Sequence, residues 1–298
     1  MAQLHALAVN TFEQGFLFAF LGLGVLITFR FFRFPDLTAE GSYTLGGAVV
    51  STLLIDGVHP VLAIAAAVVA GMAAGTVTAL IHTKLRINNI ISGIIVMTAL
   101  YTVNLRVMGR ANVSLLSVAT LYDRVSTWLA AHGVAMPDYL MSISLNFLML
   151  TVAAVLLARF MGTDLGLAVR GTGENEPMVQ ALGVDTDITK MIGLALSNGA
   201  VALSGALVAQ DNGFADIGMG TGVLVTGAAA VMIGEALFGD RSIPRWIVAT
   251  ILGVLVYRFL VAVALRVGLS PVDLKLVTAA LLLASLSLPR FRNLMAKG

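Results

Sequence analysis

The stretch NIISGIIVMTALYTVNLRVM, residues 89–108, decides the fold class because it is apolar over the length of one bilayer crossing. A helix needs about 20 mostly apolar residues to cross the hydrocarbon core of a membrane. Eight further runs of this kind occur along the chain, at 12–32, 37–55, 60–82, 139–161, 189–209, 222–238, 244–265 and 272–288. Glycine or a polar residue interrupts some of them, so the sequence predicts eight or nine spans.

The composition supports the same fold class. Hydrophobic residues make up 58% of the chain, charged residues 11%, and the mean hydropathy is +0.95. Soluble domains have about 25% charged residues. We therefore predict one polytopic all-α transmembrane domain over residues 1–298. The apolar runs are continuous rather than alternating, which disfavours a β-barrel.

Several classes of chemistry lack the residues they need. The chain has no cysteine, its four histidines are scattered, and it holds no His-Glu-x-x-His, Gly-x-Ser-x-Gly or phosphate-loop motif. A non-catalytic chain without a metal or cofactor of its own is expected, so any ATP hydrolysis must come from another chain. The net charge of +2 gives no reason to expect a nucleic-acid partner.

Lysine and arginine mark the cytoplasmic loops of membrane proteins. Most of these residues fall on one side when nine spans are counted, and the loops 56–60 and 210–222 on the other side have none. This predicts an N-terminus outside, a C-terminus in the cytoplasm, a cytoplasmic loop at about 162–188 and an external loop at about 109–137. The first ten residues lack a basic leader, so the first span is expected to remain as an anchor. The loop 109–137 has an amphipathic pattern, typical either of an interfacial anchor or of a helix that shapes the outer gate.

Two segments of the chain resemble each other. FPDLTAEGSYTLGGAVV (34–50) and FADIGMGTGVLVTGAAAV (214–231) both open with Phe-x-Asp and share glycine spacing. Five spans separate them, so the pair predicts an inverted-topology repeat of the kind found in transporters. The glycines in the two segments favour either close helix packing or a broken helix: Gly41, Gly46, Gly47, Gly222 and Gly227.

RGTGENEPMVQALGVDTD, residues 170–187, is polar although the chain around it is not. Thr172 or Gly173 is suited to cap a short helix, Pro177 is tolerated in its first turn, and Gly183 suits its end. A helix of nine residues is about 14 Å long and too short to span. With Met178, Val179 and Leu182 on one side, it is expected to dock a protein partner on the cytoplasmic surface. The residues predicted to couple to that partner are Glu174, Asn175, Glu176, Pro177, Met178, Val179, Gln180, Leu182 and Gly183.

Polar side chains inside spans are costly and usually face protein or water. Thr98, Tyr101 and Asn104 follow one another at intervals of three residues, so we expect them to share one helix face. Such residues either line a translocation path or make hydrogen bonds between helices. The candidates for the path are Ser92, Thr98, Tyr101, Asn104, Asn198 and Thr278.

The chain resembles permeases of binding-protein-dependent ABC importers, in the family of the branched-chain amino acid and ribose permeases. The likeness covers nearly the whole sequence and is most specific at 41–47, 88–116, 170–187 and 193–222. Within that family the pattern is most similar to the single-permease group linked to tryptophan, tyrosine or related ligands. Pro177 departs from the family pattern, which has a charged or small residue there.

The resemblance implies a type II-like permease fold in the bacterial inner membrane. It also implies that two such chains, as a homodimer, form the path for a small solute, an amino acid or related compound. A cytoplasmic ATPase dimer that binds ATP-Mg, an extracytoplasmic binding protein and membrane lipid are the implied partners. An ion-coupled secondary transporter with inverted repeats is the alternative, although it would have no use for a docking helix at 174–183.

Overall fold

The computed structural model describes residues 2–134, 136–239, 242–270 and 273–283, and within these ranges the chain is almost entirely helical. The elements are α1 (Ala2–Leu26), a π-helical turn η1 (Ile27–Phe31), α2 (Thr38–Ile55), α3 (Pro60–Leu85), α4 (Asn89–Met108), β1 (Asn112–Ser114), α5 (Leu121–Ala131), α6 (Asp138–Met161), α7 (Asp164–Ala181), α8 (Thr186–Asn212), β2 (Phe214–Asp216), α9 (Val223–Phe238) and α10 (Ile243–Arg266).

The helix ends follow local capping chemistry. Asn88 accepts a hydrogen bond from the amide of Ile90 at the start of α4, and Gly109 ends the same helix with a φ of 69°. A short polar side chain before a helix and a left-handed glycine after it are preferred caps. The predicted span 89–108 therefore coincides with α4.

Six of the described helices are long and apolar enough to cross a membrane: α1 with η1, α3, α4, α6, α8 and α10. The other predicted spans differ from these six. Helix α2 is largely buried and is too polar to qualify as a membrane-spanning helix by composition. Helix α9 has only 16 residues, and Leu274–Leu283 is a shorter apolar helix. The rest of the predicted span 272–288 lies outside the described residues.

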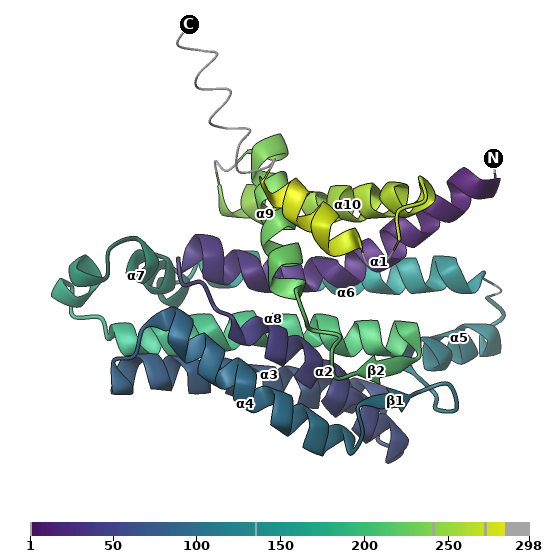
Figure 1. Ribbon diagram of the computed structural model, residues 1–298, viewed down its shortest axis with the longest axis horizontal. Coiled ribbons are helices and arrows are strands. Elements are labelled where there is room, and N and C mark those ends of the chain that lie inside the picture. The colour runs from purple at the N-terminus through teal and green to yellow at the C-terminus, as the bar shows by residue number, and fades with distance from the viewer. Residues whose placement is uncertain (1, 135, 240–241, 271–272, 284–298) are drawn as a thin grey trace, which may run out of the picture.

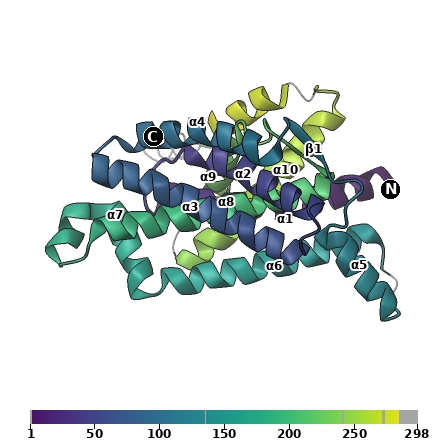
Figure 2. The same cartoon turned by 90° about the horizontal axis from the view of Figure 1, so that it is seen from below.

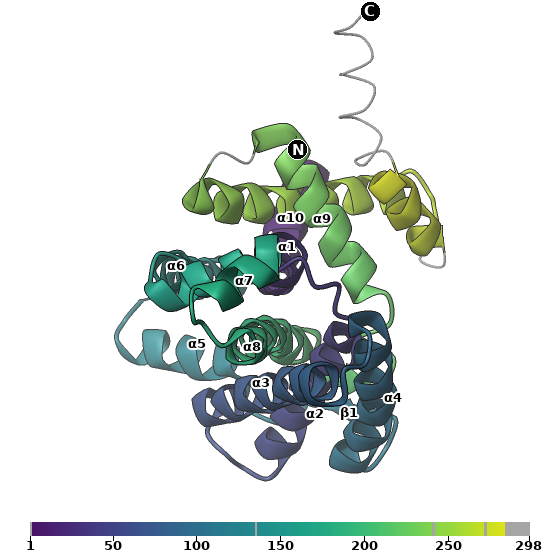
Figure 3. The same cartoon turned by 90° about the vertical axis from the view of Figure 1, so that its left-hand side faces the viewer.

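Helix α8 lies in the middle of the bundle and packs against α1, α2 and α3 (Figure 3). The long helices run roughly side by side, whereas α9 crosses their direction (Figure 1). A helix of 16 residues is about 24 Å long. This is too short to cross the hydrocarbon core of a membrane even along the membrane normal, and a tilted helix reaches less far across it.

The two ends of the bundle differ (Figures 1 and 2). Helix α7 forms one end, here called the α7 end. At the other end, here called the β end, α1 begins and β1 pairs antiparallel with β2, with Val113 opposite Ala215. The loops 109–137 and 210–222 thus meet on one side of the molecule, as the sequence predicted. The amphipathic part of the first loop is α5, capped by Thr120 and Asp123.

Glycine lets α2 lie against α8 with almost no space between the backbones. A Cβ at Gly46 would overlap the carbonyl of Ala202, and one at Gly205 would overlap the carbonyl of Tyr43. Helix α2 is continuous through Gly41, Gly46 and Gly47, so these residues serve packing. The chain is instead broken before α2, between η1 and Thr38.

The two similar segments meet inside the molecule. Each leads from Phe-x-Asp into a helix, α2 at Thr38 and α9 at Val223. The amide of Gly222, which caps α9 with a φ of 83°, donates to the carboxylate of Glu40 at 3.0 Å. The amide of Gly220 donates to the Thr44 hydroxyl at 3.1 Å. Gly227 packs against Val25. The inversion of the two copies stays a prediction from the sequence.

Candidate functional site

The predicted docking helix is the second limb of α7. The backbone of Asn175 leaves the helical region, with φ −155° and ψ 90°, and divides α7 into two limbs. The Asn175 side chain accepts a hydrogen bond from the amide of Met178 at 3.1 Å. Asn175 therefore caps the second limb, and the expected cap at Thr172 or Gly173 was wrong. Pro177 falls in the first turn of this limb, where its missing N–H removes no helical hydrogen bond.

The second limb ends as the sequence predicted. Gly183 has a φ of 83°, its amide donates to the carbonyl of Gln180, and the amide of Val184 donates to the carbonyl of Val179. These two bonds form a Schellman motif, which ends a helix firmly. We call residues 176–182 the docking limb.

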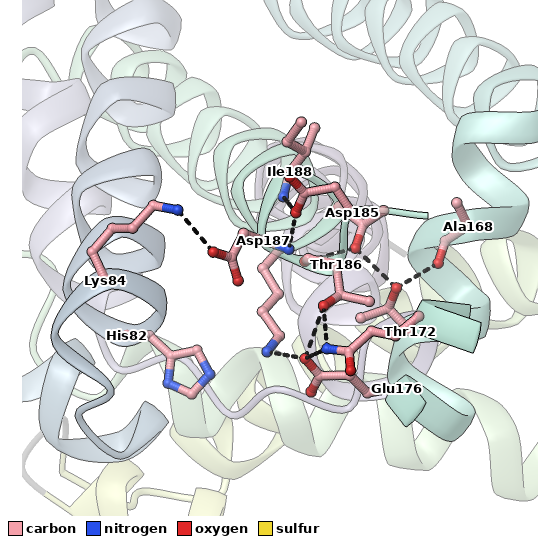
Figure 4. A network of polar contacts seen from close by, with 12 residues as sticks. His82, Lys84, Ala168, Thr172, Glu176, Asp185, Thr186, Asp187 and Ile188 are labelled. Atoms are coloured by element: carbon pink, nitrogen blue, oxygen red, sulfur yellow. Dashed lines mark hydrogen bonds and ion pairs between the residues drawn. The ribbon is translucent and has the colours of Figure 1, made fainter. Parts of the chain in front are cut away.

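One carboxylate fastens the docking limb to α8 (Figure 4). Glu176 Oε1 accepts hydrogen bonds from Lys190 Nζ at 2.6 Å, from the Thr186 hydroxyl at 3.0 Å and from Gln180 Nε2 at 3.3 Å. Beside this cluster the hydroxyls of Thr172 and Thr189 bond at 2.9 Å. Both limbs of α7 are thus tied to the first turns of α8.

The neighbouring charges also pair within the chain. Glu174 forms an ion pair with Arg33 at 2.7 Å, and Lys84 pairs with Asp187 at 2.9 Å. Gly173 lies against the backbone of Phe31 and Phe32, so α7 also contacts the break before α2. Glu174 and Glu176 were predicted to couple to a partner, and this stays a prediction. Within the chain, the Glu176 carboxylate holds the docking limb on α8, whereas the ion pair of Glu174 with Arg33 lies at the surface.

The outward side of the docking limb is apolar. Met178 is 50% exposed and Leu182 74% exposed, and Pro177, Gln180 and Ala181 are exposed beside them. Val179 was expected on the same surface, but it is buried and packs against Gly171. We call the surface of Pro177, Met178, Ala181 and Leu182 the apolar tip.

The predicted path residues fall into two groups. Buried ones make hydrogen bonds between helices: Ser42 donates to Asn198 Oδ1 at 2.7 Å, and Asn104 donates to the carbonyl of Gly41 at 3.1 Å. Ser92 bonds to the carbonyl of Asn88 within α4, and Thr278 lies 2.7 Å from the Tyr257 hydroxyl. Thr98 and Tyr101 are exposed on α4, whereas Asn104 is buried, so these three do not line one surface within a single chain.

Two ionisable side chains in the interior, the buried Asp36 and the half-buried Arg258, were not among the predicted path residues. Asp36, in the break before α2, accepts a hydrogen bond from Asn198 Nδ2 at 2.6 Å and one from the amide of Thr38 at 2.9 Å. Arg258, within α10, lies with its guanidinium 3.3 Å from the centre of the Phe18 ring. The sequence signal for Arg258 was its place inside an apolar run, eight residues before Arg266.

Comparison with known proteins agrees with this architecture. The family model described as branched-chain amino acid transport system / permease component matches residues 7–286. A tyrosine transport system permease protein of Clostridioides difficile (strain R20291) is 38% identical over 279 residues, covering 94% of this chain and 90% of that protein. An uncharacterised protein of Rickettsia prowazekii (strain Madrid E) is 34% identical over 285 residues, covering 94% and 96%. No solved structure gives a significant match.

The family match and the first relative each cover more than nine tenths of the chain, and the family match includes α7 and the central α8. The chain therefore belongs to the branched-chain amino acid transport system permease family and is the multi-pass membrane permease component of a transport system.

Proposed function

We propose that this chain, as a homodimer, forms the translocation path of an ATP-driven importer for an amino acid. A cytoplasmic ATPase dimer would bind the apolar tips, and an extracytoplasmic binding protein would deliver the solute at the β end. This assigns the α7 end and the C-terminus to the cytoplasm and the N-terminus to the outside of the bacterial inner membrane. The C-terminus itself lies outside the described residues.

The observation that carries the proposal is the docking limb. It exposes Met178 and Leu182 at the end of the molecule, yet it is bonded through Glu176 to the most central helix. An exposed apolar surface rimmed by polar groups is typical of a protein interface. A limb fastened to a core helix moves that helix when a partner pushes it, which is how small shifts become alternating access.

The exposed polar residues of α4 support a second copy. Thr98 and Tyr101 lie on an apolar helix face, and polar side chains in lipid are costly. Both side chains would be accommodated if α4 faced another copy across a polar path. Because the chain has no cysteine, a Tyr101→Cys variant gives a single reactive site for cross-linking in membranes. Leu156→Cys, on an exposed part of α6, is the matched control.

The proposed solute class follows from the relative named as a tyrosine transport system permease protein. An amino acid with an aromatic or branched side chain is the proposed solute. A neutral or zwitterionic solute also fits an interior in which few charged groups are buried.

The test is uptake into vesicles that hold the complete importer, with Met178→Asp compared with Leu165→Asp. Leu165 is exposed in the first limb of α7 and lies outside the apolar tip, so it controls for adding a carboxylate to an exposed apolar residue at the same end. We expect Met178→Asp to abolish ATP-driven uptake while Leu165→Asp retains it. Uptake driven by an ion gradient without ATP would instead establish the secondary transporter.

A further inference from the structure

Arg258 is a charged residue deep in a spanning helix. It lies 15 residues after the start of α10 and eight before its end, or about 23 Å and 12 Å along the helix axis. Its Nε is buried and has no hydrogen-bond partner among the described residues. Its guanidinium stacks on the ring of Phe18. An ionisable side chain at such a depth usually marks a substrate or ion pathway.

No acidic side chain of the described residues forms an ion pair with Arg258. The ion pairs of the described residues join Arg30 to Glu235, Arg33 to Glu174, Lys84 to Asp187 and Lys190 to Glu176, and none includes Arg258. Outside the described ranges the sequence contains one acidic side chain, Asp240, which precedes the opposite end of α10. A half-buried cation with a fully buried Nε and no paired anion is costly, so an anion brought from outside would be stabilised there.

Two cavities flank the guanidinium. The larger, of about 440 Å³, lies between α9, α10 and the helix that contains Lys275. The smaller, of about 250 Å³, lies between α1, α2, α8, α10 and the β2 turn. Its lining includes Gln14, Phe18, Tyr43, Phe214, Asp216 and Arg258. The Tyr43 hydroxyl is buried and also lacks a hydrogen-bond partner of good geometry within the described chain.

The smaller cavity offers the groups that a free amino acid needs. Arg258 supplies a planar donor fork that matches a carboxylate. Asp216 also lines the cavity and is only partly engaged, by the amide of Gly218 at 2.8 Å and by Asn112 Nδ2 at 3.3 Å. The remaining lone pairs of the Asp216 carboxylate can accept hydrogen bonds from an ammonium group. Phe18 and Phe214 add aromatic surface for an apolar side chain.

We propose that the cavity around Arg258 is a binding site for the transported amino acid, with its carboxylate on Arg258 and its ammonium toward Asp216. This rests on the proposed function as an amino acid importer. The site lies toward the β end, where a binding protein would release the solute. An anionic lipid phosphate offers Arg258 a similar partner, but the carboxylate of Asp216 would repel it while attracting an ammonium group.

Binding to the full-length chain in phosphatidylcholine nanodiscs tests the site directly. Radiolabelled L-tyrosine and L-leucine are the probes, with tyramine, which lacks the carboxylate, and 3-(4-hydroxyphenyl)propionate, which lacks the ammonium, as competitors. We expect Arg258→Gln to weaken binding about 10- to 100-fold, as loss of a hydrogen bond to a charged group does. Arg258→Lys should recover part of the affinity, and Arg266→Gln, at the end of the same helix, should bind as the wild type does.

Folding provides a second readout. Removing an unpaired buried charge should leave the thermal unfolding midpoint of Arg258→Gln unchanged or higher, whereas a structural ion pair would lower it. Should that variant fail to fold, Asp216→Asn addresses the same site. It should weaken binding of L-tyrosine and leave binding of 3-(4-hydroxyphenyl)propionate nearly unchanged.

The outcomes separate this site from the wider proposal. Tyramine competing as well as tyrosine, equal affinity in Arg258→Gln, or no binding of either probe to the wild-type chain would overturn the site. So would displacement of Arg258-dependent binding by phosphatidylglycerol alone, which would assign the residue to lipid. ATP-driven uptake of amino acids by the complete importer would still stand in each of these cases. Conversely, Arg258-dependent tyrosine binding without such uptake would keep the site and remove the importer.

Discussion

Lys190 donates a hydrogen bond to Glu176 at 2.6 Å and thereby joins the docking limb to α8. The two residues face each other across the turn at 182–185, with Lys190 11% and Glu176 36% exposed. Thr186 bonds to the same carboxylate oxygen. Because α8 packs against α1, α2 and α3, a displacement of the limb reaches the centre of the bundle through this cluster.

Replacing Lys190 with methionine should uncouple the limb from α8. The loss of stability should be below about 1 kcal/mol, because Glu176 is about a third exposed and water can replace the donor. In the ATP-driven importer proposed above, the solute moved per ATP hydrolysed should fall severalfold, while ATP hydrolysis continues. The measurement is that ratio in vesicles with the complete importer.

Two further variants sharpen this prediction. Lys84→Met removes an ion pair to Asp187 in the first turn of α8 without touching the docking limb, so its ratio should stay near the wild-type value. The exchanged pair Glu176→Lys with Lys190→Glu should restore part of the ratio lost in Lys190→Met. Equal ratios in Lys190→Met and Lys84→Met would show that the cluster does not transmit the movement.

The cap at Asn175 should hold the docking limb in its helical form. Asn175→Ala removes the acceptor for the Met178 amide and should cost the limb about 1 kcal/mol, whereas Asn175→Asp keeps an acceptor in place. Amide hydrogen exchange at Met178 should rise about fivefold in the alanine variant and stay near the wild-type rate in the aspartate variant. Similar exchange in both variants would mean that contacts with α8 alone fix the limb.

The helices were largely predictable because their limits are local. The run 89–108 became α4 residue for residue, since a capping asparagine and a left-handed glycine mark its ends. The end of the docking limb at Gly183 was predictable for the same reason. The limits of α2 and α9 were also predicted to within one residue, but their packing was not: α2 is largely buried, and α9 crosses the direction of the long helices (Figure 1).

The contacts at the candidate site needed the tertiary structure. Glu176 and Lys190 are 14 residues apart, and nothing in their spacing shows that they face each other. The same holds for Asp36 and Asn198, which are separated by 162 positions. The exposure of Thr98 and Tyr101 beside a buried Asn104 could not be predicted either, because periodicity defines a helix face but not what covers it.

Asn198 should be a sensitive position in the core. It donates to Asp36, accepts from Ser42 and is fully buried. Asn198→Leu leaves the Asp36 carboxylate with one donor fewer and should lower stability by about 1–3 kcal/mol. Asp36→Asn combined with Asn198→Leu should cost less than the sum of the single changes, because the two side chains interact. Thermal unfolding in detergent measures each step, and strict additivity would contradict the coupling.

Gly205 should tolerate no side chain where α8 meets α2. A methyl group there would overlap the carbonyl of Tyr43, which belongs to the backbone and cannot rotate away. Gly205→Ala should therefore force the two helices apart and lower stability by about 1–3 kcal/mol, the usual cost of overpacking. Gly162→Ala is the matched control, because an added Cβ would meet its neighbours at ordinary contact distances of 3.4 and 3.7 Å and its φ is −89°. Thermal midpoints of the two variants that differ by less than one degree would show that α2 and α8 can separate without cost.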